Sequence, residues 1–394
     1  MPTFNDIVWT NERIFMIDFG RAKTGSAHRR FPDVDTCGYR DDAFVDEHGA
    51  IVSAMVGQRK VNVRFFRSEI STSAKLFAVS QDPSIVKITS PAGTGQLSAK
   101  VAQNIEFSAL AAGRTMIDIR YNWTDGPVLG RLYVQVYARI RIPMRAHLLT
   151  VNGLGQPNNF LSQVCATRAQ RVARFKEFVS KASESWISHG VVLAVAEVVD
   201  TVWGVAQIPS GVQNPSLMET LTAGMTSPNR SAVSINVFVV PSIAAPVTGI
   251  GVSRAMAITM GLVAPAAPPP PPAVQHFGSG LYLHSASAAT PQTIEHEMGH
   301  IMSLCALPNQ GHSTGDLASG VHTRDDLISR RRLMYPNVGL NNAAPNNWRH
   351  DTGYGDHKAG SLVTYRRLPV AQDITFEESR RARDAATAPG FFAP

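Results

Sequence analysis

The chain has 394 residues, of which 44% are hydrophobic and 17% are charged. This balance allows a full hydrophobic core and excludes an intrinsically disordered chain. The formal net charge of +7 comes from scattered lysines and arginines, which argues against nucleic-acid binding. The three cysteines lie far apart and form no CxxC pair, so we expect neither a disulfide framework nor a cysteine zinc cluster.

The sequence offers no sign of a membrane or secretory segment. The N-terminus lacks a basic stretch followed by an apolar one, so no cleaved signal peptide is expected. No stretch approaches the roughly 18 apolar residues of a spanning helix. We therefore expect a soluble protein that is cytoplasmic as synthesised. If it acts outside the cell, a signal-independent secretion system must export it.

Residues 1–142 have the pattern of a β-rich domain. Apolar and polar side chains alternate at 61–65, 115–121 and 131–137, as they do in strands with one buried face. Turn-forming aspartate, proline and glycine residues separate these runs. Several short strands with such punctuation predict a β-sandwich.

Two stretches within this domain resemble bacterial immunoglobulin-like domains. Residues 79–86 (VSQDPSIV) are similar to an Asp-Pro-containing strand of that family, and residues 107–115 (FSALAAGRT) to its glycine turn into the next strand. The resemblance implies an immunoglobulin-like module, clearest at 75–140. A generic sandwich with no partner of its own is the alternative.

From residue 143 to 394 the pattern changes to mixed α/β. A strand is predicted at 146–151, followed by a long amphipathic helix at 166–189. Apolar runs then predict buried strands at 191–199 and within 231–241. The loop at 264–273 contains five consecutive prolines, which favour an extended surface spacer over a docking site. A short strand is expected at 280–285.

The helix that Thr290-Pro291 should open carries the candidate chemistry. His296 and His300 are four residues apart, so one helix face presents both imidazoles, which can bind one Zn²⁺. Glu297, next to the first histidine, can accept a proton from the attacking water as general base. The alternative is a pair of structural histidines with hydrogen bonds inside a core.

The HExxH run at 296–300 and the later run RLMYP at 332–336 together resemble the metzincin clan of metallopeptidases. The resemblance implies an α/β zincin domain with one catalytic Zn²⁺ and a tight turn that places Met334 beneath the metal. Tyr335 is then a candidate to line the pocket or to donate to the oxyanion.

The third metal ligand is where the chain departs from that clan. Metzincins continue as HExxHxxGxxH, but Ser303 occupies the glycine position and Ala306 the third-histidine position. The next histidine, His312, follows a glycine in a turn, and we predict it as the third ligand on a longer loop. The alternatives, in decreasing order, are Asp316, His322 and Asp325.

The resemblance also implies an order of elements: a strand, a long helix, two strands, an edge strand and the active-site helix. We assign the edge strand to Leu281, Tyr282 and Leu283, whose backbone could pair with an extended peptide substrate. A closing helix is predicted at 376–383, after Thr375 as N-cap. The resemblance covers about residues 145–385, and its specific motifs lie at 296–336.

The sequence thus predicts a multidomain protein, with an all-β immunoglobulin-like sandwich followed by an α/β zincin domain. The predicted activity is zinc-dependent endopeptidase cleavage of protein or peptide substrates. Two alternatives stay open: an inactive zincin that serves as a binding module, and a peptidase toxin or effector delivered by a specialised secretion system.

Overall fold

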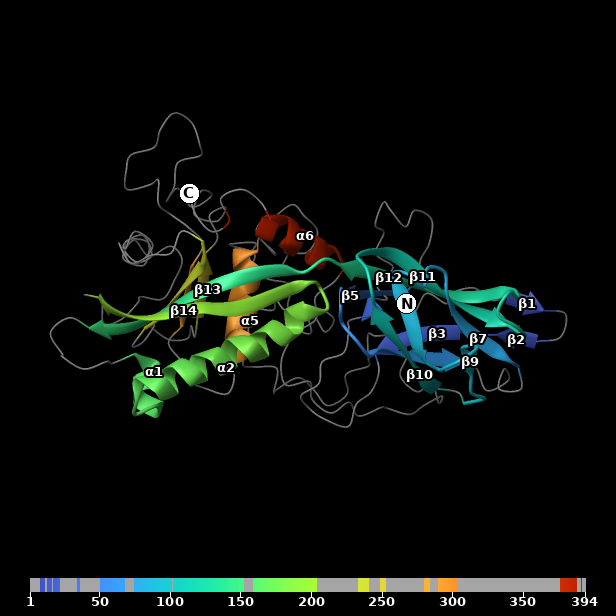
Figure 1. Ribbon diagram of the computed structural model, residues 1–394, viewed down its shortest axis with the longest axis horizontal. Helices are drawn as coiled ribbons and strands as arrows, with labels where there is room; N and C mark the ends of the chain where they lie inside the picture. The colour runs from blue at the N-terminus through green and yellow to red at the C-terminus, as the bar shows by residue number, and fades with distance from the viewer. Residues whose placement is uncertain are drawn as a thin grey trace, which may run out of the picture.

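The computed structural model contains two regions of regular structure, each with its own sheets and its own hydrophobic core (Figure 1). It describes residues 8–10, 13–15, 17–21, 34–35, 50–67, 74–100, 102–151, 159–203, 233–240, 249–252, 280–283, 290–302, 376–387 and 391.

The first region is built from β-strands, which confirms the predicted all-β N-terminal part. A short hairpin joins β1 (Val8–Thr10) and β2 (Arg13–Phe15). One sheet has the order β3 (Ile17–Arg21), β6 (Val61–Arg67), β10 (Ala102–Ala109), β8 (Val86–Ser90). The other has the order β4 (Val34–Asp35), β5 (Ala50–Met55), β12 (Val128–Tyr137), β11 (Gly113–Tyr121), β7 (Leu76–Ser80), β9 (Gln96–Leu97).

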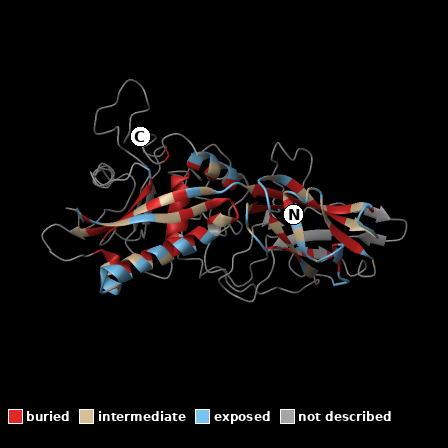
Figure 2. Ribbon diagram, viewed as in Figure 1, coloured by how far each residue is buried: buried red, intermediate tan, exposed pale blue. Residues whose placement is uncertain are grey.

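The two sheets pack face to face through a single apolar cluster. Phe65 of β6 and Phe107 of β10 come from one sheet, and Ile117 of β11 and Val134 of β12 from the other; all are fully buried. Figure 2 shows buried positions along the strands of this region. Alternation in each strand sends every second side chain into the core, so the pattern that predicted strands also produces a sandwich.

The second region contains a five-stranded sheet with helices. Its order is β14 (Val191–Trp203), β13 (Ile140–Val151), β15 (Ile235–Val239), β17 (Gly280–Leu283), β16 (Gly249–Val252). The first four strands are parallel, and β16 runs antiparallel to β17. The described helices are α1 (Phe160–Val164), α2 (Arg168–Ile187), α5 (Thr290–Ile301) and α6 (Phe376–Thr387).

The long predicted helix is confirmed as α2, which links the parallel strands β13 and β14. Thr167 and Gln170 form a reciprocal capping box that satisfies free backbone N–H groups at its start. The stripe at Phe175, Val179 and Trp186 is buried against the sheet. A parallel pair requires such a crossover element, so α2 and the two strands form one unit.

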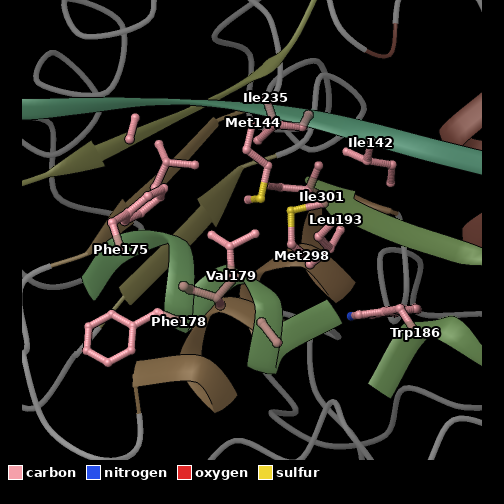
Figure 3. Packing of buried hydrophobic residues seen from close by; sticks show 14 of the residues in the cluster. Ile142, Met144, Phe175, Phe178, Val179, Trp186, Leu193, Ile235, Met298 and Ile301 are labelled. Carbon is pink, nitrogen blue, oxygen red and sulfur yellow. The ribbon is translucent and has the colours of Figure 1, made fainter. Parts of the chain in front are cut away.

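Helix α5 packs on α2 and on β16 and β17, within the same core. Figure 3 shows Met298 and Ile301 of α5 beside Met144 of β13 and Val179 of α2. These contacts fix the orientation of α5 on the sheet, and they thereby fix the direction of its opposite face, which carries His296 and His300.

The structure corrects the predicted edge strand. Leu281, Tyr282 and Leu283 lie in β17, which pairs with β15 on one side and with β16 on the other. In the described sheet, the end strand next to β17 is β16, at Gly249–Val252, and β14 lies at the other end. Its two glycines weaken the strand pattern, and a glycine-rich strand gives little signal of its own. The strand predicted at 280–285 exists, but it lies inside the sheet.

The predicted C-terminal helix is confirmed as α6. Strand β13 starts at Ile140, so it crosses the predicted boundary between residues 142 and 143. The proline-rich loop at 264–273 lies outside the described residues. None of the helices that the structure describes is both long enough and apolar enough to span a membrane.

We expect Phe175→Ala to lower the free energy of unfolding of the second region by about 3–5 kcal/mol, because Phe175 is fully buried in its core. Urea unfolding followed by the fluorescence of Trp186, which belongs to the same core, measures the change. Lys176→Ala, at an exposed neighbouring position, is the control and should change little. Equal effects from the two substitutions would contradict this packing.

Candidate metal centre

The predicted metal-binding helix forms where the sequence places it. Helix α5 begins at Thr290, and His296, Glu297 and His300 all lie on it. The three side chains are buried, with 3%, 8% and 6% of their surface exposed. The two imidazole rings face each other edge to face, with 4.9 Å between their centroids and 83° between their planes.

This arrangement suits a shared metal ion. Nitrogen ligands bind Zn²⁺ at about 2.0–2.1 Å, and two rings at this separation on one helix face can direct one nitrogen each to a common point. The core contacts of Met298 and Ile301 hold the opposite face of the helix. The two imidazoles are therefore positioned by packing and not by their own contact alone.

Glu297 and its neighbour Glu295 take different places around α5. A helix turns about 100° per residue, so Glu297 lies on the same side of His296 as His300, and Glu295 lies on the other side. Glu295 is fully buried, and no sequence pattern indicated it as a site residue. Of these two carboxylates, Glu297 is therefore the one on the same side of the helix as His300.

The described residues supply two of the predicted ligands. No group of three or more His, Cys, Asp or Glu side chains that could hold a metal occurs within the ranges that the structure describes. The remaining predicted site residues follow Met302, in the stretch 303–375, which lies outside those ranges. They are His312, Asp316, His322, Asp325, Met334 and Tyr335, and they stay predictions.

His147 is also buried, but it belongs to the other face of the sheet. Its neighbours Ala146 and Leu148 point into the core shared with α5, so His147 points away. Its Nε2 donates to Asn236 Oδ1 at 3.0 Å, and its Nδ1 accepts from the Thr201 hydroxyl at 3.1 Å. Both ring nitrogens are used, which makes this histidine structural.

The surroundings of His147 favour its neutral form. Its ring stacks on Phe238 with 4.7 Å between centroids. Burial lowers the pKa of His147 below its ordinary value, and the hydrogen bond to Asn236 opposes this only in part. Stability from this group is therefore present above about pH 6.5, the pKa in an unfolded chain, and is lost as the pH falls below it.

Comparisons with known proteins assign no family. No protein family and no curated protein matches the chain. Among solved structures, domains 4 and 5 of the S-layer protein SbsC are similar at 19% identity and a TM-score of 0.18, over 24% of this chain and 49% of that one. Domains 5–6 of SbsC are similar at 18% identity and a TM-score of 0.18, over 29% of this chain and 55% of that one. This chain thus spans about half the length of each, and such TM-scores assign no fold.

We predict that the stability advantage of the wild type over His147→Gln shrinks as the pH falls from about 7 to about 5. Glutamine cannot titrate, whereas the buried neutral imidazole loses its advantage when the unfolded chain takes up a proton. Chemical unfolding at several pH values measures the difference. A difference that stays constant or grows toward low pH would show that the histidine is not held neutral.

Proposed function

We propose that this protein is a zinc-dependent endopeptidase whose metal is held by His296 and His300. The observation that carries the proposal is their geometry: two buried imidazoles on one face of α5, with ring centroids 4.9 Å apart and Glu297 on the adjoining position. His312 is the third ligand that we propose, with Asp316 as its alternative.

The position of Glu297 on α5 is compatible with a bound cation. Glu297 is buried and lies next to His296 in the chain. A divalent ion held by neutral imidazoles would supply a positive charge at the face of the helix on which Glu297 lies.

In the proposed reaction, a bound Zn²⁺ would polarise the scissile carbonyl and lower the pKa of a water toward about 7. Glu297 accepts a proton from the attacking water and then passes it to the leaving amine. Met298 faces the core, so it holds the helix and takes no part in the reaction.

The order of elements supports a zincin-type domain. Strand β13, the long helix α2, strands β14 and β15, the edge strand β16 and helix α5 follow one another in the chain. This is the layout that the metzincin resemblance implies, with the inner strand β17 placed between the edge strand and α5. The two packed sheets of the first region are in turn compatible with an immunoglobulin-like module.

The edge strand β16 is where we propose that an extended peptide binds. β16 pairs with β17 on one side, and no other described strand pairs with its second side. Backbone groups there can accept a substrate strand. Helix α5 packs against β16, so a peptide on that edge would lie near this helix.

The enzyme is tested with Glu297→Gln, which keeps the shape of the side chain but removes its basicity. We expect the wild type and the variant each to hold one zinc per chain, and cleavage of a denatured protein to fall by at least about a hundredfold in the variant. Zinc is measured by elemental analysis and cleavage by gel electrophoresis.

Glu295→Gln is the matched control, since it removes the same charge from another buried position on the same helix. It should retain cleavage, whereas His296→Ala should lose zinc. A wild type without stoichiometric zinc would overturn the proposal. Zinc in the wild type without any cleavage would instead favour the inactive binding module.

The peptide site is tested by hydrogen exchange on Glu297→Gln with a bound peptide substrate. We expect slower exchange at the backbone amides of β16, because strand addition would satisfy them. The amides of β17 are the internal reference, because this strand already pairs on both sides. Protection that spares β16 would contradict binding at this edge.

A further inference from the structure

The two cores meet at a very short link. Strand β12 of the sandwich ends at Tyr137, and β13 of the second sheet begins at Ile140, so only residues 138–139 lie between them. Both linking residues are exposed. The Ile140 amide donates to the Gly190 carbonyl at 2.8 Å, which ties the start of β13 to the turn after α2.

Helix α6, from the C-terminal end of the chain, lies across this junction (Figure 1). It packs against β13 of the second region and β5 of the sandwich. The Arg383 guanidinium lies over the Tyr137 ring, with 4.4 Å from its central carbon to the ring centroid. The same guanidinium donates from Nη1 to the His189 carbonyl at 3.2 Å. One side chain thus joins the last sandwich strand to the end of α2.

The junction is tightly filled. Gly190 has a φ of +73°, and a Cβ at this position would collide with Arg383 Nη1 and lie 2.5 Å from Tyr137 Cβ. Only glycine leaves room for the arginine to reach both partners. On an adjoining face of α6, Ala382 and Ala386 pack into the core of the second region. The helix is therefore anchored in one region while Arg383 holds the other.

The surroundings of the contact strengthen it. Burial raises the pKa of Tyr137 and lowers that of Arg383, so both groups are partly removed from water. A guanidinium over an aromatic face gains more when solvent is excluded, and arginine keeps its charge in such places. The contact thus differs from an exposed surface pair, which contributes little.

We propose that α6 is a clasp that fixes the sandwich in one orientation against the α/β region, with Arg383 as the side chain that closes it. Each region has its own core, so opening the clasp frees the sandwich to move about residues 138–139 without unfolding either part. The orientation of the sandwich relative to α5 is thereby set by the C-terminal end of the chain. This inference does not depend on zinc or on cleavage.

Limited cleavage by trypsin provides the test. Trypsin cleaves after arginine, and Arg139 lies in the exposed link. The next residue, Ile140, is hydrogen-bonded to Gly190, so cleavage requires the link to open locally. In the full-length chain, Arg383→Ala should speed the cut after Arg139 by about tenfold, as expected when a desolvated cation–π contact is lost. Mass spectrometry follows the two products. The control is Arg380→Ala, which removes an exposed charge from the same helix and should leave the rate unchanged.

Two variants of Tyr137 keep the test decisive if Arg383→Ala does not fold. Tyr137→Phe retains the aromatic ring face, so trypsin should cleave it after Arg139 at the wild-type rate. Tyr137→Leu lacks the ring, so trypsin should cleave it as fast as is expected for Arg383→Ala. Circular dichroism should show the native helix and strand content in both variants. Wild-type rates for Arg383→Ala or Tyr137→Leu, or loss of both cores in Tyr137→Leu, would overturn the proposal.

Discussion

The candidate site depends on how one face of α5 packs into the α/β core. Ile294, Met298 and Ile301 contribute to the cluster that α2 and the parallel strands complete. Because a helix has 3.6 residues per turn, fixing this face also fixes where His296 and His300 point. The apolar face of α5 supplies the packing energy, and this allows the opposite face to carry polar residues. The candidate metal ligands and part of the core therefore belong to the same helix.

The same logic extends to the sheet beneath α5. The helix crosses β16 and β17, which places the histidine-bearing helix beside the only antiparallel strand of that described sheet. Within the described sheet, each inner strand pairs with a neighbour on both sides, and each of the two end strands pairs on one side. Of the two end strands, β14 and β16, it is β16 that packs against α5, so strand order decides which end of the described sheet lies beside the histidine-bearing helix.

Regular elements were predictable where the periodicity was strong. The alternation in β6, β11 and β12, and the helical stripe in α2, predicted elements that the structure confirms. The end strand at 249–252 was missed because it is short and half of its residues are glycines. The apolar run at 281–283 has the composition of a strand, and the structure places it inside the sheet. Composition indicates that a strand exists, but strand order depends on long-range pairing.

The sequence by itself determined the spacing of His296, Glu297 and His300, because helical geometry converts a four-residue interval into one face. It also determined that a β-rich part precedes an α/β part. Only the tertiary structure decided that β16 is the edge, that His147 faces away from α5, and that Arg383 meets Tyr137 across more than two hundred residues of chain. Those three facts depend on contacts between distant segments, and local periodicity contains no information about which distant segments meet.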